Sequence, residues 1–253
     1  MDRPRGPLPT RLDDVDLLPP EYDAALDEGL HALRLTLSDE ARAALAGHAR
    51  LVLAWTSSIN LTAIREPAAV ATLHVVDSLT AVPLLRDRNV DDVLDLGSGA
   101  GYPGVPIAVA LPARQMLLVE SIGKKARFLD VARVATDLGE RVAVAAERAE
   151  ALAQDPRHRD RWSAVLARAV GPLDRLIALA MPLLRPGGAL VAWKRAPIDD
   201  ELRAAEAVLA RHGAHAPRIE PVTVPGLADH VLVIVERRDT ERYGPRGRGR
   251  RQR

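Results

Sequence analysis

The chain of 253 residues contains no cysteine, and only 3% of its residues are aromatic. The first absence excludes disulfide bonds, thiolate metal sites and a cysteine nucleophile. The second means that the core must be built mainly from Ala, Val, Leu and Ile. Hydrophobic residues make up 47% of the chain and charged residues 27%, which is an ordinary balance for a globular protein.

The sequence also lacks a strong charge of either sign, because its formal net charge is +1. A nucleic-acid surface would therefore have to come from local clusters of its 35 Lys and Arg residues. The N-terminus has no apolar segment of the secretory type, and no apolar run approaches the length of a membrane span. We expect a soluble, cytoplasmic protein with neither a membrane partner nor a bound metal.

The residue pattern divides the chain into four parts. Residues 1–24 are rich in Pro, Asp and Arg and predict a mobile leader, and residues 238–253 form an Arg/Gly-rich tail that we expect to be disordered. Residues 25–89 show helical spacing, with a helix start at Ser38 and another near Pro67. They predict an N-terminal helical extension to the domain at 90–237.

The part from 90 to 237 alternates between strand and helix patterns. This order predicts an α/β fold with a doubly wound, mostly parallel, Rossmann-like sheet. The last two strands are separated by "PGLAD" and predict an antiparallel end to the sheet. The expected strands are 90–96, 116–121, 141–147, 163–168, 188–194, 217–224 and 230–236.

The stretch "VLDLGSGAGYPGVP" at 93–106 predicts a ligand-binding turn after the first strand. Its glycines Gly97, Gly99 and Gly101 allow close backbone approach and positive φ angles. "GAGYPG" matches the dinucleotide fingerprint only from Gly99, whereas a count from the first glycine after the strand puts Tyr102 where a glycine is needed. No P-loop lysine follows. Asp95 before G-x-G-x-G is instead the pattern of an S-adenosylmethionine site.

Two acids follow later strands of the predicted sheet. Glu120 ends the second strand, where a carboxylate can accept hydrogen bonds from both ribose hydroxyls, of either NAD or S-adenosylmethionine. Glu150 follows the third strand, where its side chain can meet an adenine edge. The alternative is that both are solvated acids at strand ends. "LLRPGGALVAW", before and within the fifth strand, contains a turn common in methyltransferases.

Two classes of methyl acceptor can be eliminated from the sequence. Carbon-5 pyrimidine methylation needs a cysteine, which is absent. Exocyclic amine methylation typically shows a D/N-P-P-Y/F motif after the fourth strand, where this chain has "LARAVGPLD". An acceptor without a proton to remove, such as guanine N7, is favoured, and small-molecule oxygen or nitrogen acceptors remain open. A small-molecule methyltransferase, a non-catalytic cofactor-binding protein and, least favoured, a nicotinamide dehydrogenase are the competing interpretations.

Four motifs occur together and in order: "INLTAI" (59–64), "HVVDSL" (74–79), "DLGSGAGYPGVPIA" (95–108) and "LARAV" (166–170). The set resembles the bacterial RsmG (GidB) family, class I methyltransferases that modify guanine N7 in the 16S ribosomal RNA of the small (30S) subunit. The resemblance covers about 40–237. It implies S-adenosylmethionine as cofactor, with contacts at Gly97, Tyr102, Glu120, Ala149, Glu150 and Arg168, besides the glycines Gly99 and Gly101. Where many members have W-N, this chain has Trp55-Thr56.

Further polar residues are candidates for holding the base. Arg168 is expected beside the cofactor, where it meets the methionine carboxylate or RNA, or else pairs with Asp95 or Glu120. His74 and Asp77 share a helix face, so that Asp77 can fix the histidine tautomer while His74 contacts phosphate or the base, or else the two form a structural hydrogen-bond pair. The alternative for Asp77, as for Asn60, is turn formation and helix capping. The full set of these candidates before the sheet is Asn60, Arg65, His74, Asp77 and Ser78.

Basic residues near the expected cleft are candidates for RNA contacts. Lys124, Lys125 and Arg127 lie at a helix start, where positive charge opposes the helix dipole unless a phosphate compensates it. Arg65 and Lys194 are further candidates. The alternative for these residues is a solvated surface. In the tail, Arg246, Arg248, Arg250, Arg251 and Arg253 predict salt-sensitive, non-specific RNA affinity, or else a solubilising segment.

Overall fold

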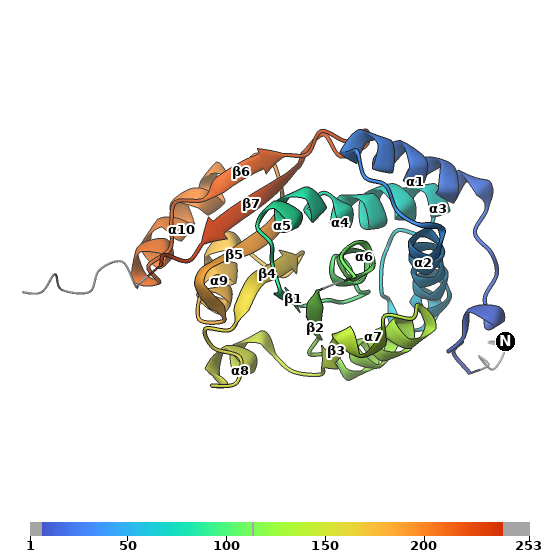
Figure 1. Ribbon diagram of the computed structural model, residues 1–253, viewed down its shortest axis with the longest axis horizontal. Coiled ribbons are helices and arrows are strands. Elements are labelled where there is room, and N and C mark those ends of the chain that lie inside the picture. Colours follow the sequence, from blue (N-terminus) through green and yellow to red (C-terminus); the bar gives the residue numbers. More distant parts are fainter. Residues whose placement is uncertain (1–6, 113, 240–253) are drawn as a thin grey trace, which may run out of the picture.

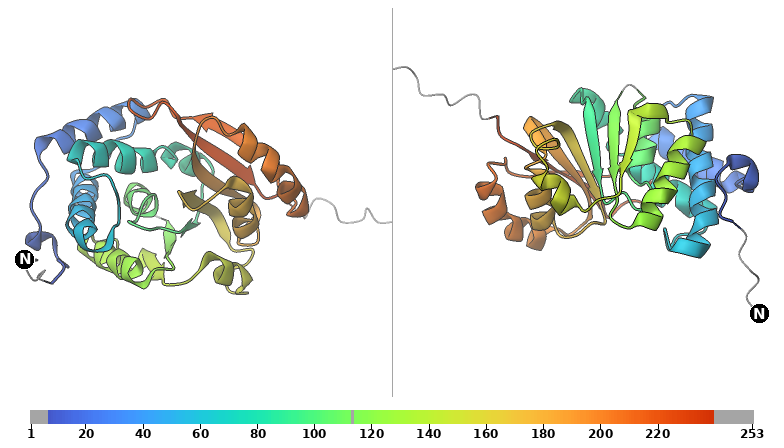
Figure 2. Two further views of the ribbon diagram at one scale, coloured as in Figure 1. Left: turned by 180° about the vertical axis from the view of Figure 1, so that it is seen from behind. Right: turned by 90° about the horizontal axis from the view of Figure 1, so that it is seen from below.

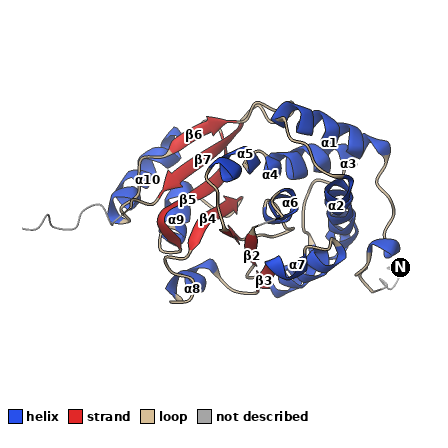
Figure 3. Cartoon of the chain, viewed as in Figure 1, coloured by secondary structure: helices blue, strands red, loops and turns tan. Residues whose placement is uncertain are grey.

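The computed structural model describes residues 7–112 and 114–239. Its centre is a seven-stranded sheet in the order β3-β2-β1-β4-β5-β7-β6 (Figures 1 and 3). β1 to β5 run parallel, and β7 runs antiparallel to both β5 and β6. The strands are β1 (Asp92–Leu96), β2 (Gln115–Val119), β3 (Val142–Ala145), β4 (Trp162–Arg168), β5 (Leu184–Arg195), β6 (Arg218–Pro221) and β7 (His230–Glu236).

All seven strands lie within or overlap the segments predicted from the sequence, and the antiparallel end of the sheet is confirmed. β1 and β4 are buried along nearly their whole length, which explains why their sequences are continuous apolar runs. The chain order changes direction between β1 and β4, since β2 and β3 lie on one side of β1 and β4, β5 and β7 on the other. Open α/β sheets bind ligands at the carboxyl end of such a switch point.

Helices cover both faces of the sheet, so that two apolar layers form (Figure 2). On one face, α6 and α7 lie against the strands and are covered in turn by α2, which contacts both. On the other face, α9 packs on β5 and is flanked by α8 and α10. These helices are α6 (Gly104–Ala110), α7 (Gly123–Ala135), α8 (Ala149–Gln154), α9 (Leu173–Ala180) and α10 (Asp199–Arg211), with a 3-10 turn η3 (Gly139–Arg141) before β3.

The N-terminal extension is helical, as the spacing predicts. Ser38 begins α2 by accepting a hydrogen bond from the N–H of Ala41, and Pro67 begins α3 behind the capping carboxylate of Glu66. Leu51 and Trp55 of α2 belong to the same apolar cluster as sheet residues, so the extension shares its core with the main domain. Its elements are η1 (Leu12–Asp14), α1 (Pro20–Leu33), α2 (Asp39–Ile59), α3 (Pro67–Val70), the π-helical turn η2 (Ala71–Val76), α4 (Asp77–Leu79) and α5 (Val82–Asp87).

The segment before α1 differs from the mobile leader expected for residues 1–24. Arg50 donates hydrogen bonds to the carbonyl oxygens of Leu12, Val15 and Asp16, and the Trp55 indole donates to that of Pro9. These contacts hold residues 9–16 against α2. Composition alone does not reveal this, because the partners are backbone carbonyls that every residue carries. Residues 1–6 and the tail from 240 onward lie outside the described part of the chain.

One continuous helical segment is longer and more apolar than we expected from the sequence. Residues Pro67–Asp87 have the length and mean hydropathy of a membrane span, 21 residues at 1.6, although no apolar run of that length was expected. The run carries His74 and Asp77, is 56% buried in its most apolar window, and contacts α1 and α6. These packing contacts make it a core helix of the fold.

Candidate active site

The glycine turn after β1 follows the predicted pattern, and its glycines are needed for different reasons. Gly97, Gly99 and Gly101 all have positive φ angles, of 68°, 57° and 86°. A Cβ atom at Gly97 would lie 2.8 Å from the side chain of Val170, and one at Gly101 would lie 2.8 Å from His48. At Gly99 the nearest atom would be a backbone oxygen at 3.8 Å. The turn is therefore closely packed at Gly97 and at Gly101, and there is open space at Gly99 between them.

A cleft of about 490 Å³ opens in front of this turn. It lies at the carboxyl ends of β1, β2 and β4, and a smaller cavity of about 130 Å³ continues it toward the end of β3. The two share Gly97, Ser121 and Val170. The cleft is lined by Leu61, Thr62, His74, Gly97, Ser98, Gly99, Ala100, Tyr102, Glu120, Ser121, Ile122, Lys125, Arg168, Ala169 and Val170.

Glu120 lies at the mouth of this cleft with 6% of its surface exposed. One carboxylate oxygen accepts the N–H of Gly99 at 3.0 Å, and the other accepts the N–H of Ile122 at 2.7 Å. These bonds fix the carboxylate beside the glycine turn. An ionised carboxylate has about four lone-pair sites, so two remain for hydroxyl donors. The geometry fits the ribose of an adenosine cofactor.

Asp95 lies beneath the glycine turn's far end, where it binds the first residue of α6. Its side chain is fully buried, and one oxygen accepts the N–H of Gly104 at 3.1 Å, at the start of α6. The other oxygen has no hydrogen-bond partner among the described residues. Burial raises the pKa of this carboxyl to about 7, although the hydrogen bond from Gly104 opposes the rise.

Two stacked rings line the cleft, and the buried ring of His48 packs behind them. Tyr102 stacks on His74 with ring centroids 4.7 Å apart, and His48 packs against its ring with centroids 4.6 Å apart. His48 Nε2 bonds to the carbonyl oxygen of Ala100 at 2.8 Å, so α2 is tied directly to the glycine turn. The Tyr102 hydroxyl is buried and has no hydrogen-bond partner in the described chain.

Arg168 joins the end of β4 to the helical extension. Its Nη1 atom donates to the carboxylate of Asp77 at 2.9 Å and to the carbonyl of Leu73 at 3.1 Å. The second Asp77 oxygen accepts from Nδ1 of His230 at 2.7 Å. The expected alternative of a pair with Asp95 or Glu120 is not formed, because Asp77 supplies the carboxylate.

His74 has different partners from those predicted. Arg168 donates to its Nδ1 at 3.2 Å, so the ring proton is on Nε2, which donates to the Thr62 hydroxyl at 2.7 Å. Burial, and then the Arg168 charge, lower the pKa of His74 to about 4. The imidazole is neutral at pH 7. The predicted fixing of its tautomer by Asp77 is wrong, since Arg168 and Thr62 do this instead.

The π-helical turn η2 explains why these residues meet. It spans Ala71–Val76 and passes directly into α4 at Asp77. Such turns widen the helix locally and leave carbonyl groups for other donors, and they often occur at functional sites. Here the Leu73 carbonyl accepts from Arg168, beside the ring of His74.

Ala149 and Glu150, the residues predicted to contact adenine, line the smaller cavity. Glu150 is 46% exposed and pairs with Arg175 at 2.7 Å, and that hydrogen bond lowers the pKa of its carboxyl. The backbone at 149–150 therefore offers the fixed part of this wall, while the Glu150 side chain stays in solvent.

Three predicted base-binding or RNA-binding residues have structural roles instead. Asn60 ends α2 in a left-handed conformation with φ of 53° and does not line the cleft. The hydroxyl of Ser78 donates to the His74 carbonyl. Lys194 is only 10% exposed and binds the carboxylate of Glu201 at 2.6 Å and the carbonyl of Gly171 at 2.7 Å. The alternative for Lys194, a solvated surface lysine, is therefore wrong.

Of the other basic candidates, one lines the cleft and three are exposed. Lys125 lines it from the first turn of α7, and Lys124 and Arg127 are exposed on the same helix. Arg65 is exposed in the segment before α3. Within the part of the chain that the structure describes, none of these side chains forms an ion pair, so their charges are available to an anionic ligand.

Four residues of the site were not predicted. Thr62 lies within the quoted "INLTAI" motif, but nothing local marks it as the partner of His74. His48, Trp193 and His230 come from α2, β5 and β7, and only the fold brings them to this edge. Over the described ranges, no group of three His, Asp or Glu side chains has a metal-binding arrangement.

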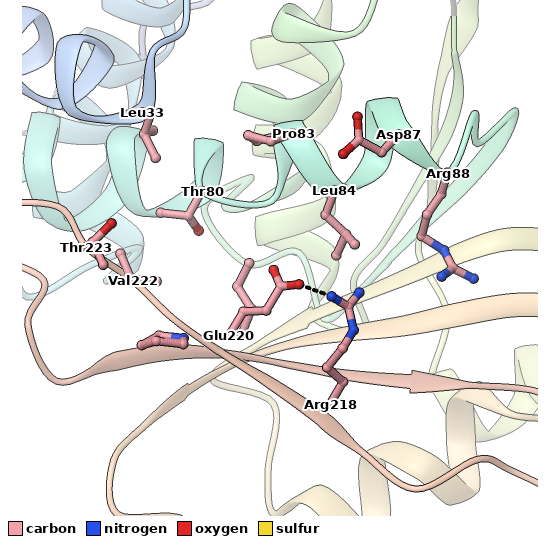
Figure 4. A pocket seen from close by; sticks show the side chains of 12 residues that line it. Leu33, Thr80, Pro83, Leu84, Asp87, Arg88, Arg218, Glu220, Val222 and Thr223 are labelled. Atoms are coloured by element: carbon pink, nitrogen blue, oxygen red, sulfur yellow. Dashed lines mark hydrogen bonds and ion pairs between the residues drawn. The ribbon is translucent and has the colours of Figure 1, made fainter.

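Another cavity, of about 430 Å³, lies between α5 and the edge strand β6 (Figure 4). It contains the ion pair between Arg218 and Glu220, with Leu84, Pro83 and Thr80 from the helical side. It shares no lining residue with the cleft at the glycine turn. This cavity is therefore separate from the cleft at the carboxyl edge of the sheet.

Comparison with known proteins agrees with the fold and the motifs. The structure of an O-methyltransferase from Bacillus cereus in complex with S-adenosylhomocysteine has a TM-score of 0.54 at 17% identity, over 75% of this chain and 90% of that one. The SAM-dependent O-methyltransferase of Thermotoga maritima has a TM-score of 0.50 at 16% identity, over 74% and 71%. At such low identity these two show the class I methyltransferase fold alone.

Closer relatives are found by sequence. Ribosomal RNA small subunit methyltransferase G of Xanthomonas axonopodis pv. citri is 40% identical over 222 residues, which are 87% of this chain and 97% of the relative. The protein of the same name from Roseiflexus castenholzii is 40% identical over 182 residues, 72% and 77% of the two chains. Residues 41–226 match the family described as rRNA small subunit methyltransferase G (GidB). The chain belongs to this family.

Proposed function

We propose that this protein transfers a methyl group from S-adenosylmethionine to N7 of a guanine in the 16S ribosomal RNA of the small subunit. Family membership supports the methyl transfer and the class of RNA. The observation that carries the choice of acceptor atom concerns His74 and Asp77, the two candidate bases nearest Arg168, whose acceptor atoms are already bonded. His74 uses both ring nitrogens and Asp77 uses both carboxylate oxygens.

The cofactor would lie along the cleft from the glycine turn to the smaller cavity. Glu120 would accept the ribose hydroxyls, the open backbone at Gly99 would face the methionine part, and the backbone at 149–150 would contact adenine. Arg168 would face the methionine carboxylate beside Tyr102. When bound, S-adenosylmethionine supplies an electrophilic methyl group on a sulfonium.

Guanine N7 suits a site of this kind because it has a lone pair and no proton to lose. The protein then needs to orient the base and exclude water, and it needs no general base. A neutral His74 with both nitrogens bonded is consistent with such a positioning role. A base inside an RNA stack would have to turn out of it to reach the cleft.

RNA binding would use Lys125 in the cleft and the exposed cations Arg65, Lys124 and Arg127. Phosphate contacts of this kind are salt-dependent and independent of sequence. A substrate in ribosomal subunits implies action in the cytoplasm.

Transfer of labelled methyl groups tests the substrate class. Purified protein and labelled S-adenosylmethionine are incubated with small and large subunits from a strain that lacks this methyltransferase. We expect label in the small-subunit RNA and background in the large-subunit RNA. Labelling of neither, with the cofactor bound, would contradict the proposal and favour a small-molecule acceptor.

A further inference from the structure

A cavity not yet described, of about 370 Å³, adjoins the cofactor cleft, and we call it the second cavity. The two share His74, Arg168 and Ala169, so Arg168 lies on the boundary between them. The lining residues of this second cavity are Ile64, Leu73, His74, Asp77, Arg168, Ala169, Gly171, Trp193, Lys194, Arg195 and His230.

The cavity lies farther along the same edge of the sheet. Arg168 ends β4 and Arg195 ends β5, and His230 begins the antiparallel β7 opposite Arg195. The cleft, in contrast, extends from the end of β4 in the other direction, to the ends of β1 and β2. Two ligands can therefore lie side by side at the carboxyl edge, one on each side of Arg168.

The charges around the second cavity are balanced. Arg168 pairs with Asp77 at 2.9 Å, Lys194 with Glu201 at 2.6 Å, and Arg195 with Asp229 at 2.8 Å. A neutral base becomes a cation when its ring nitrogen is methylated. Unpaired cations would oppose that charge, most strongly in a poorly solvated cavity, whereas paired ones do not.

In this cavity the carboxylate is fully engaged, whereas Arg168 keeps free donors and Nε2 of His230 has no hydrogen-bond partner among the described residues. Of the five N–H groups of an arginine, those of Arg168 make three contacts, and Nε and one hydrogen of Nη2 have no partner among the described residues. Asp77 is the one carboxylate in the lining, and both its oxygens are engaged. Ile64, Leu73 and Trp193 add apolar surface for a flat ring.

We infer that this second cavity receives the target guanine, with N7 directed past Arg168 toward the cofactor cleft. A free N–H of Arg168 suits the O6 acceptor of guanine, and adenine carries an amino donor at that position. The inference rests on the proposed function, since it assigns the acceptor of that same reaction.

Filling the cavity tests the inference. Ile64→Trp places a large ring in it from the segment before α3, and Arg195→Trp does so from the end of β5. Each variant is assayed for methylation of small subunits and for binding of S-adenosylhomocysteine by calorimetry. We expect the methylation rate to fall by at least about tenfold while the dissociation constant stays within about twofold.

The matched control fills the cavity of Figure 4, which has a similar volume, by Thr223→Trp at an exposed position. This variant should methylate at the wild-type rate. A wild-type rate in either Ile64→Trp or Arg195→Trp overturns the inference, as does loss of S-adenosylhomocysteine binding in both, because the cavity would then belong to the cofactor. Failure of the proposed function is distinct, since the wild-type protein itself would then be inactive.

Discussion

The carboxylate of Asp77 lies 2.9 Å from the guanidinium of Arg168, and only 2% of the Asp77 side chain is exposed. One residue is in the helical extension and the other ends a central strand, so this pair connects the two parts of the molecule at the cleft. His230 binds the other oxygen of the same carboxylate. The extension is thus part of the site as well as a cover for the sheet.

Removing the Asp77 carboxylate should be costly, because it leaves Arg168 buried and unpaired. Asp77→Ala should lower the free energy of unfolding in urea by about 3–5 kcal/mol. The control Asp200→Asn breaks an exposed pair with Arg203 and should cost less than about 1 kcal/mol. Equal effects of the two substitutions would mean that the buried pair contributes no more to the free energy of unfolding than the exposed one.

Glu120 should determine cofactor affinity. Glu120→Gln keeps the shape but replaces one acceptor oxygen with an amino group, next to the N–H of Gly99 or of Ile122. We expect the dissociation constant for S-adenosylhomocysteine to rise about 10- to 100-fold by calorimetry. Glu140→Gln, at an exposed position in η3, should leave it unchanged. Unaltered binding in Glu120→Gln would exclude Glu120 from the ribose site.

Asp95 should make stability depend on pH in the direction opposite to most carboxylates. Its pKa rises from 3.8 to about 7 on folding, so the folded protein keeps a proton that the unfolded chain releases. This contribution to stability is complete below about pH 4 and is lost as the pH rises through 7. Asp95→Asn does not titrate. Its stability relative to wild type should increase by about 2–4 kcal/mol between pH 4 and 8 in urea unfolding, and a constant difference would refute the shift.

His74 should act by positioning Arg168. Its pKa of about 4 means that it protonates only as the pH falls well below its ordinary value of 6.5. His74→Gln should reduce kcat by roughly tenfold and leave the pH profile of kcat between 6 and 8 flat, as in wild type, whereas loss of a general base typically costs about 10²–10⁴-fold. Thr62→Val, which removes the partner of Nε2, should have a smaller effect of the same kind. A profile that loses a titrating limb in the variant would show acid–base catalysis by His74.

The parts of the fold that could be predicted are those encoded locally. The buried strands are continuous apolar runs, and the glycine turn with Asp95 and Glu120 follows directly from strand ends. The network around Asp77 could not be predicted, because its partners Arg168 and His230 are 91 and 153 residues away along the chain. Lys194 is a different case, because its partner Glu201 is near in the sequence, but their ion pair requires the loop after β5 to place α10 beside the strand end.

The identity of the methylated atom tests the account most directly. Small subunits from a strain lacking this methyltransferase are incubated with the protein and S-adenosylmethionine, and the 16S RNA is digested to nucleosides for mass spectrometry. We predict that 7-methylguanosine appears with the wild-type protein and is absent with a heat-inactivated sample. Methylation at any other atom, or no methylated nucleoside although the cofactor binds, would contradict the assignment of guanine N7 as the acceptor.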